Sequence, residues 1–414
     1  MEKKSRTSAK HARSKLLAGW AKSEFQPPAG APMPGYIARK SVSTGQADPL
    51  SVRALVLQQE NARVAILTAD ILLFSNRWAD RLRARLAAIA GTEKENVIVA
   101  ATHTHSGPLV DTAPFGLLGN QRPGSPGPRA TMRRVETAMA KSVEAAAASM
   151  TQLTAEMARI NVRGVATDRN DATQATTQPL SLFRFATRNH RAFLAVYGCH
   201  STVLGPDNTL FSGDLQGEVS RRLEQDAEVA LVGTGAAGNI STRFTRRGQT
   251  FDEVHRLAAL VHKRVRHAKF QRLSATGISV RSLKLRLPVR DLSKSQRAAQ
   301  AKTGRLAVVE KEGRKVLAHL RTLPDFKRGF VNIPFTQIAL GDVSLVALPF
   351  EMFSDTGDFI WKWSRAILLG YANGYWGYLP SPAASSGSYE TLSSPYDEQA
   401  DTILRDAVKA DWAR

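Results

Sequence analysis

Two histidines placed two residues apart are the side chains of this 414-residue chain that point most directly to chemistry. His103 and His105 lie in the run Thr-His-Thr-His-Ser-Gly-Pro, which follows the apolar segment 97–101. In a strand, side chains at positions i and i+2 point to the same side, so both imidazoles would face one pocket. The pattern fits a metal site, and it fits equally a histidine that caps a strand followed by a solvated loop residue.

Four more polar clusters follow segments whose residues favour buried strands. His200 comes after the run Ala-Phe-Leu-Ala-Val-Tyr-Gly-Cys, and Ser241 lies in a glycine- and alanine-rich run, 233–243, that matches no P-loop or dinucleotide fingerprint. Glu351 follows a strand-like run, and residues 370–380 with Tyr389 form the last cluster. A Cys199–His200 nucleophile is disfavoured, because adjacent residues of a strand point to opposite faces.

Composition limits the class of protein. A hydrophobic content of 43% is typical of a globular chain. The single cysteine, Cys199, excludes an internal disulfide and a cysteine-rich zinc site, so a metal would be held by His, carboxylate or phenolate groups. No run reaches ~18 consecutive apolar residues, so no transmembrane segment is expected. The basic N-terminus lacks a signal-peptide core, which predicts a protein that is cytoplasmic or peripheral to a membrane.

Positive charge is concentrated in one segment. The chain carries a formal net charge of +21, and residues 261–330 hold nineteen Lys or Arg against four Asp or Glu. This segment predicts contact with an anionic membrane surface, an acidic substrate or an acidic polymer, and its alternative is a solvated helix face. Nucleic acid is disfavoured as a partner because no zinc finger, RNP motif or Walker loop accompanies the charge.

Strand-like and helix-like segments alternate along the chain, which predicts an α/β fold with a mixed sheet core. The expected strands are 53–58, 63–69, 97–102, 155–162, 192–198, 228–233, 278–287, 335–340 and 344–348. The expected helices are 77–90, 131–150, 215–225, 252–270, one within 292–323, and 353–368. No linker divides the chain, so we expect a basic tail over residues 1–18 and a single domain over 19–414.

Taken together, the five clusters resemble the neutral ceramidase family, zinc-dependent amidases that cleave the N-acyl bond of ceramide. The family signature His-Thr-His-Ser-Gly-Pro is present at residues 103–108, and the proline-rich segment 24–36 resembles a family segment that ends in Gly-Tyr. The resemblance extends from about residue 19 to about residue 394. It implies a ceramidase-like catalytic domain, built as a multilayer sandwich with mixed β-sheets and flanking helices.

The resemblance also implies a metal site and its chemistry. Carried over by position, the Zn²⁺ ligands are His103, His200, Glu351 and Tyr378. Tyr378 is preferred to Tyr375 because the family ligand lies five residues after the asparagine matched by Asn373. This ligand set leaves room for a water molecule, whose pKa zinc lowers toward neutrality.

The same resemblance implies roles for the residues around the metal. His105 would carry the proton to the leaving amine. Arg169 matches the family's active-site arginine, and Tyr389 matches a tyrosine that stabilises the oxyanion. Ser241 matches the family serine, which either attacks the carbonyl or positions the substrate, and attack by metal-activated water is favoured.

Two aspartates also match family positions. Asp70 and Asp214 would orient a ligand histidine from behind it. For Asp214 the favoured alternative is an N-cap of the helix that follows it.

Departures from the family pattern affect the substrate rather than the metal. Asn239, Thr242 and Arg243 replace Asp, Pro and Asn of the family signature, and Leu109-Val110 replaces glycines. The sequence given ends without the C-terminal β-sandwich of full-length ceramidases. We therefore expect a zinc-dependent hydrolase of an N-acyl amide of ceramide or a related compound. The alternatives are an amidase or deacetylase of a polar anionic substrate, such as an acidic glycan, and a non-catalytic protein that binds polyanions or membranes.

Overall fold

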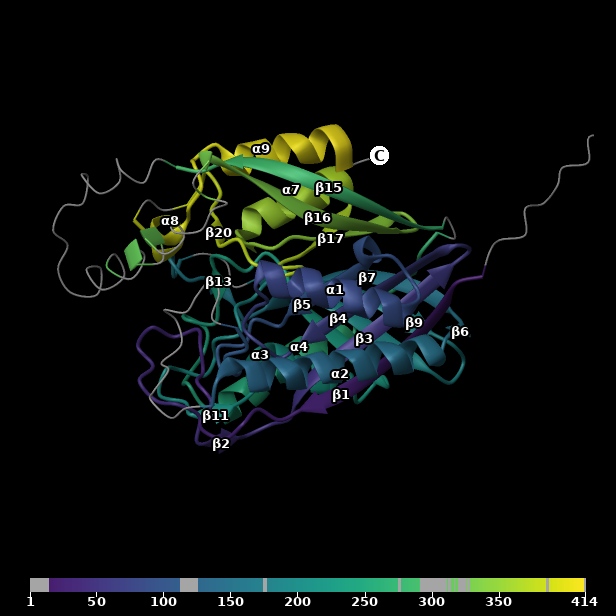
Figure 1. Ribbon diagram of the computed structural model, residues 1–414, viewed down its shortest axis with the longest axis horizontal. Helices are drawn as coiled ribbons and strands as arrows, with labels where there is room; N and C mark the ends of the chain where they lie inside the picture. Colours follow the sequence, from purple (N-terminus) through teal and green to yellow (C-terminus); the bar gives the residue numbers. More distant parts are fainter. Residues whose placement is uncertain are drawn as a thin grey trace, which may run out of the picture.

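The computed structural model describes residues 15–111, 126–173, 177–274, 277–290, 328–384 and 387–412, with the isolated positions 311, 314, 315, 317, 318 and 326. Within these residues, two five-stranded sheets form the centre of the fold (Figure 1). The first has the order β5-β4-β3-β1-β6, with β1 Leu17–Phe25, β3 Leu50–Gln59, β4 Ala62–Ala69, β5 Val97–Ala101 and β6 Thr151–Gln152. The second has the order β12-β10-β9-β7-β14, with β7 Thr154–Arg163, β9 Thr177–Ala186, β10 Arg191–Tyr197, β12 Val229–Thr234 and β14 Gln271–Arg272.

Both sheets are mixed. In the first, β4 and β5 run parallel while the other pairs are antiparallel. In the second, β10 and β12 run parallel while the other pairs are antiparallel. The two strands that precede His103 and His200, β5 and β10, are therefore each held by a parallel neighbour.

The alternation of side chains along the strands produces the layers. In β4, Ala65 and Leu67 pack under α1 (Asn76–Ala90) and α2 (Pro128–Ala148), while Val64 and Ile66 face the second sheet. In β10, Leu194 faces the first sheet and Phe193 packs under α3 (Asp214–Leu223) and α4 (Phe251–Arg266). Figure 1 shows α1 and α2 lying along the first sheet. The order is helices, sheet, sheet, helices, which confirms the predicted α/β sandwich.

A smaller sheet completes the core. Its order is β15-β16-β17-β19, with β15 Ile278–Pro288, β16 Phe330–Leu340, β17 Val343–Ala347 and β19 Ala366–Leu369. One face joins the core between the two large sheets through Ile338 and Leu345. The other packs against α7 (Ser354–Ser364) and α9 (Ala400–Ala407), beyond which a π-helical turn, η3, covers Val408–Trp412.

Short two-stranded pairs connect the loops around the candidate site. They are β2 (Gly45–Gln46) with β11 (Leu210–Phe211), β8 (Thr167–Asp168) with β13 (Ile240–Ser241), and β18 (Glu351–Met352) with β20 (Tyr378–Leu379). A 3-10 turn, η1 (Lys94–Asn96), precedes β5, and α8 (Tyr389–Ser393) follows β20.

The predicted helix over 353–368 is wrong in its last part. Arg365 has a φ of 54°, which ends α7 at Ser364, and residues 366–369 form β19 instead. β1 begins at Leu17, within the last two residues of the expected tail, and residues 1–14 lie outside the described residues. The helix expected within 292–323 falls almost wholly outside the described residues.

Candidate active site

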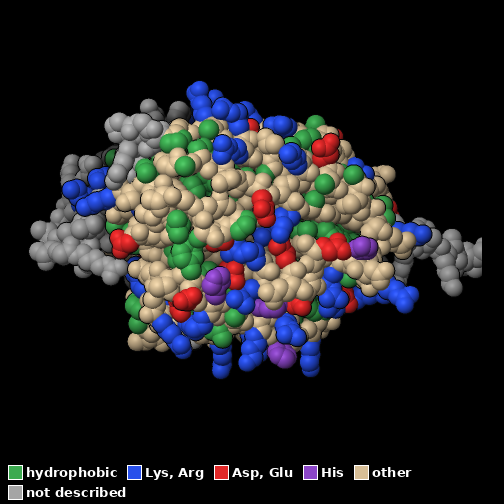
Figure 2. All heavy atoms as spheres, turned by 90° about the horizontal axis from the view of Figure 1, so that it is seen from below, with side chains coloured by type: hydrophobic (Ala, Val, Ile, Leu, Met, Phe, Trp, Pro, Cys, Tyr) green, Lys and Arg blue, Asp and Glu red, His purple; other side chains and the backbone are tan. Residues whose placement is uncertain are grey.

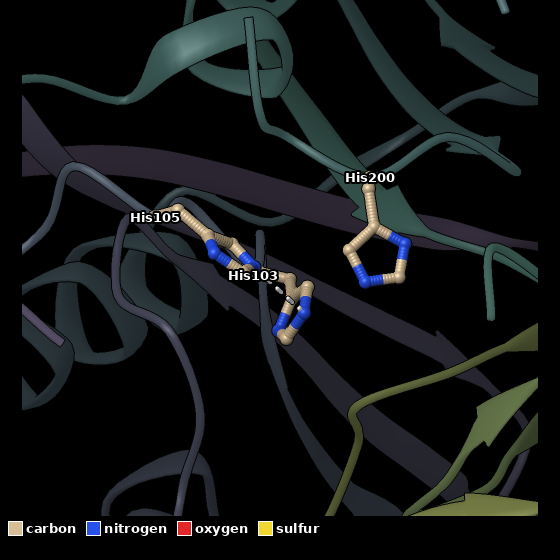
Figure 3. Close-up of side chains that lie close together, drawn as sticks. All are labelled: His103, His105 and His200. Carbon is tan, nitrogen blue, oxygen red and sulfur yellow. Dashed lines mark hydrogen bonds between the residues drawn. The ribbon is translucent and has the colours of Figure 1, made fainter. Parts of the chain in front are cut away.

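Three histidine side chains converge where β5 and β10 end (Figure 3). One ring nitrogen each of His103, His105 and His200 lies within 4.8 Å of the others. The Nε2 atoms of His103 and His105 are 3.3 Å apart. The prediction that the two histidines of the opening motif share one pocket is therefore confirmed, and His200 joins them.

The backbone explains the convergence. Thr104 and Ser201 form a parallel β-bridge, and the amide of His105 donates to the carbonyl of Ser201 over 3.3 Å. These contacts place the loops after β5 and β10 side by side. His103 has a φ of 58°, so its ring does not follow the regular alternation of the strand. The left-handed conformation is uncommon outside glycine and is often found at functional sites.

Main-chain carbonyls orient two of the histidines. Each of these histidines bonds to a carbonyl through Nδ1, which directs its Nε2 into the site. His103 Nδ1 donates to the carbonyl of Leu72 over 2.9 Å, and His200 Nδ1 donates to that of Ala237 over 2.6 Å. With hydrogen on Nδ1, each Nε2 carries a lone pair when the ring is neutral. Both point to Glu351, whose Oε2 lies 2.9 Å from His200 Nε2 and 3.5 Å from His103 Nε2.

Burial sets the protonation states of these groups. It lowers the pKa of His200 to about 4 and that of His105 well below its usual value. Burial alone would raise the pKa of Glu351, but His103 and His200 outweigh it and hold the carboxyl well below its usual range. A neutral His200 imidazole and an ionised Glu351 are the forms in which these two side chains bind a metal.

Two further tyrosines, which the sequence motifs did not assign to the site, orient Glu351. Tyr371 stacks on the His103 ring at 4.0 Å and donates to Glu351 Oε2 over 3.2 Å. Tyr375 donates to Glu351 Oε1 over 2.5 Å. Only their place in the cluster 370–380, beside the assigned Tyr378, could have indicated them. Each oxygen of the carboxylate thus has a phenol partner.

Arg169 connects several parts of the site. Its guanidinium pairs with Glu390 at 2.5 Å and donates to the Tyr378 hydroxyl over 2.9 Å. It also lies 3.5 Å from His200 Nε2. Burial alone would lower the pKa of Arg169, but Glu390 and Tyr378 outweigh it and raise the pKa above its ordinary value. The structure therefore places the Tyr378 hydroxyl against Arg169, whereas the Tyr375 hydroxyl contacts Glu351.

A cavity of about 610 Å³ opens over these groups. Seven of the eight predicted site residues line it, and His200, fully buried, lies behind the wall. The seven are His103, His105, Arg169, Ser241, Glu351, Tyr378 and Tyr389. Apolar side chains contribute much of the remaining wall, including Ile37, Leu72, Leu73 and Phe244. A buried polar centre within a partly apolar cavity suits a small amphiphilic ligand.

The three residues near Ser241 that differ from the family signature are Asn239, Thr242 and Arg243, and they occupy different environments. Asn239 bridges two segments, because its amide nitrogen donates to Asp168 over 2.7 Å and its oxygen accepts from the amide of Ser354 over 2.8 Å. Thr242 is buried, whereas Arg243 is exposed on the cavity wall. Ser241 Oγ accepts from the Arg243 amide over 3.3 Å. Only Arg243 of the three departures lines the cavity.

The expected N-cap role of Asp214 is wrong. Gly213 is the N-cap of α3, and Asp214 is its first residue. The Asp214 carboxylate accepts from the amides of Val203 and Leu204, each over 3.1 Å, and thereby holds the loop after His200. Asp70 likewise accepts from a main-chain amide, that of Ser51, over 2.9 Å. Both aspartates support the loops around the site.

Cys199 is not placed to act as a nucleophile. It is fully buried in the core between the second sheet and α3 and α4. Burial raises the pKa of its thiol well above the ordinary value, so the thiolate is disfavoured. Its Sγ donates to the His200 carbonyl over 3.4 Å. The structure therefore agrees with the expectation that Cys199 and His200 do not form a nucleophilic pair.

The described part of the basic segment uses several cations within the fold. Arg290 donates to the carbonyls of Thr391 and Leu392, and Arg281 donates to that of Asp411. On the face in Figure 2, Lys and Arg recur with Asp, Glu and His between them. The anionic membrane or polymer expected for residues 261–330 stays a prediction. In the described ranges, no helix combines the length and apolarity needed to cross a bilayer.

Comparisons with known proteins agree on the fold. A sequence model of the neutral/alkaline non-lysosomal ceramidases, N-terminal part, matches residues 19–344. The structure of a ceramidase complexed with C2 superposes with a TM-score of 0.73 at 17% identity, over 97% of this chain and 75% of that chain. That of the neutral ceramidase from Pseudomonas aeruginosa gives 0.73 at 18% identity, over 97% and 74%. Comparison with curated protein sequences finds no match.

Proposed function

The chain belongs to the neutral/alkaline non-lysosomal ceramidase family, and on this premise we propose that it is a zinc-dependent amide hydrolase. Its substrate is an N-acyl compound, ceramide or a related lipid with a linear amide. The observation that carries the proposal is the convergence of His103, His200 and Glu351 at the base of a partly apolar cavity.

The donor set fits a zinc ion. The Nε2 atoms of His103 and His200 lie 3.5 and 2.9 Å from the same oxygen of Glu351, so one ion placed among these three atoms could bind all of them. Each imidazole is fixed through its other nitrogen by a carbonyl, an arrangement common among metal-binding histidines. We assign His103, His200, Glu351 and Tyr378 as ligands. When bound, zinc supplies a Lewis acid that polarises the amide carbonyl and lowers the pKa of a water molecule.

His105 is the proposed proton carrier. Its Nε2 lies 3.3 Å from the Nε2 of His103, and its ring lines the cavity. Its Nδ1 is buried with no hydrogen-bond partner among the described residues. The Nε2 atom, on the side of the other histidines, can take the proton released on attack and pass it to the leaving amine, which must leave protonated.

Arg169, Tyr389 and Ser241 bind the reacting amide in this proposal. Arg169 and Tyr389 supply hydrogen-bond donors to the carbonyl oxygen as negative charge develops on it. Tyr389 begins α8, and its ring meets that of Tyr378 edge to face at 5.9 Å. Ser241 is the positioning residue for the substrate, with water as the favoured nucleophile.

The test is hydrolysis of a fluorescent N-acyl sphingoid base together with metal analysis of the purified protein. We expect about one equivalent of zinc, loss of activity on chelation, and recovery on adding zinc. The proposed metal site would be contradicted if the purified protein held less than about a tenth of an equivalent of zinc and took up no more when zinc was added. A protein that binds zinc and the amide without hydrolysing it would support the non-catalytic alternative.

Tyr378→Phe and Tyr375→Phe separate the two candidate phenol ligands. Burial raises the pKa of both phenols well above the ordinary value, so the tyrosinate form requires a neighbouring metal ion. We expect zinc to induce a tyrosinate absorption band in the wild type and in Tyr375→Phe, but not in Tyr378→Phe. Tyr375→Phe also removes the hydroxyl that bonds to Glu351, and this loss should weaken zinc binding by about 10- to 100-fold. The reverse pattern of bands would assign the ligand to Tyr375.

Gly35→Ala tests the position of His105 without changing its chemistry. A Cβ at residue 35 would lie 2.7 Å from His105 Nδ1, so the ring must move. A displacement near 1 Å costs about 10²-fold in rate, and we expect a fall of that size in kcat. Gly30→Ala is the matched control, since Gly30 also has a positive φ but its nearest neighbour would be 3.8 Å away. Equal activity of the two variants would argue against a role for His105.

A further inference from the structure

A buried arginine lies behind the histidine proposed as proton carrier. Arg39 is 1% exposed, and within the described residues no carboxylate forms an ion pair with it. Burial lowers the pKa of its guanidinium from the ordinary value. A buried cation is costly to the fold unless other polar groups replace its lost hydration. The groups that surround Arg39 therefore indicate what this cation holds in place.

Five main-chain carbonyls accept hydrogen bonds from Arg39. Two belong to its own segment and two to the loop after β10; they are those of Met33, Pro34, Gly205 and Pro206, at 3.2–3.4 Å. The fifth bond, to the carbonyl of His105, is the shortest at 2.7 Å. Charge-assisted hydrogen bonds are strong, and the planar fork of a guanidinium fixes the directions of several at once. Arg39 therefore joins three chain segments at His105.

The surroundings of His105 show how this junction reaches the imidazole. The amide of His105 donates to the carbonyl of Ser201, so with Arg39 on its carbonyl both main-chain polar groups of His105 are held. The ring of Tyr36 contacts both residues, with its centroid 5.0 Å from that of the His105 ring and 4.9 Å from the guanidinium carbon of Arg39. Arg39 thus holds His105 through the main chain and through the aromatic ring packed on its side chain.

We propose that Arg39 is a positioning residue for the reaction, whose guanidinium holds the main chain of His105 so that the imidazole faces His103 and the cavity. This inference rests on the proposed function, in which His105 carries the proton. It extends the site to a residue that does not line the cavity. The five carbonyls that Arg39 holds include none from a proposed zinc ligand. Loss of Arg39 should therefore slow proton transfer and leave the metal bound.

Arg39→Lys tests the fork, because lysine keeps the charge but offers a single ammonium group. With the zinc-loaded protein and a fluorescent N-acyl sphingoid base, we expect kcat to fall by about 10- to 100-fold, since a displacement near 1 Å costs about 10²-fold. KM and zinc content should stay unchanged. Arg39→Gln, which removes the buried charge and most of the fork, should show the same pattern and serves if the lysine variant does not fold.

Arg83→Lys is the matched control. Arg83 is also buried and donates to main-chain carbonyls, those of Val97 and Lys94, but these lie at and just before the start of β5, whereas His103 follows its end. The control should lose stability in urea unfolding and keep the wild-type kcat at a temperature where both proteins are folded. An equal fall of kcat in Arg39→Lys and Arg83→Lys would overturn the inference.

A double-mutant cycle with His105→Ala shows whether Arg39 acts through this ring. If Arg39 only positions His105, Arg39→Lys should lower kcat by less than about 2-fold once the imidazole is absent. An equal cost of Arg39→Lys in the wild type and in the His105→Ala background would assign Arg39 a role independent of His105 and overturn the inference.

Nuclear magnetic resonance of the histidine rings gives a readout that needs no turnover. In protein labelled on its histidine rings, the signal missing from His105→Ala belongs to His105. We expect Arg39→Lys to shift or broaden this signal more than any other, and Arg83→Lys to leave it in place. An unmoved His105 signal in Arg39→Lys would overturn the inference. If the wild type hydrolyses no amide but the signal moves in Arg39→Lys alone, the positioning by Arg39 stands and the proposed hydrolysis fails.

Discussion

His103→Asn is expected to abolish hydrolysis and zinc binding while leaving the protein folded. Asparagine tolerates the positive φ of residue 103 and retains an N–H donor for the Leu72 carbonyl, which His103 now satisfies. It lacks the inward imidazole nitrogen that faces Glu351. We expect kcat/KM to fall by about 10³-fold or more, because the metal contributes several kcal/mol to the transition state. Zinc content should fall with it.

The control for this variant is another histidine whose role lies outside the site. His190 is an exposed residue in the turn between β9 and β10, paired with Glu228 at 2.5 Å. His190→Ala should keep full zinc content and activity. Circular dichroism and urea unfolding of His103→Asn establish that the fold persists. Wild-type activity in a folded His103→Asn protein would remove His103 from the ligand set.

The main elements of the fold were predictable because their side-chain patterns are local. In β4 the residues alternate between two cores, and in α1 the apolar residues recur at helical spacing, so each segment reveals its own structure. The strands β1, β9 and β19 were missed. Exposed or polar residues interrupt β1 and β9, and β19 is short and directly follows α7. Their pairing partners, rather than their own sequences, determine these strands.

The site was predictable where its residues follow strands and belong to a recognisable signature. The sequence motif placed His103 and His105, the other clusters added His200 and Glu351, and the resemblance to the family added Arg169. Local sequence could not show that Tyr371 and Tyr375 both bond to Glu351. Those contacts depend on the β18–β20 pair and on positive φ values at Tyr371 and Asn373.

Glu390→Ala is expected to destabilise the protein strongly, because it leaves a buried cation without its partner. The side chains of Arg169 and Glu390 are only 13% and 3% exposed, and their ion pair measures 2.5 Å. Breaking a buried pair by removing one partner costs ~3–5 kcal/mol. The free energy of unfolding from urea titration measures this loss. For comparison, Asp80→Ala removes the 62% exposed partner of Lys94 and should cost less than about 1 kcal/mol.

A double variant separates stability from function at the same pair. Replacing both groups by apolar residues, as Arg169→Met with Glu390→Leu, removes the unpaired charge, and such replacements are often neutral or stabilising. We expect the double variant to recover most of the stability lost in Glu390→Ala. It should remain inactive, since Arg169 is the proposed oxyanion donor and Glu390 holds α8, which carries Tyr389. Recovery of stability together with activity would mean that the pair only supports the fold. Stability restored without activity identifies the buried ion pair as part of the site, kept because it fixes the donor that the reaction needs.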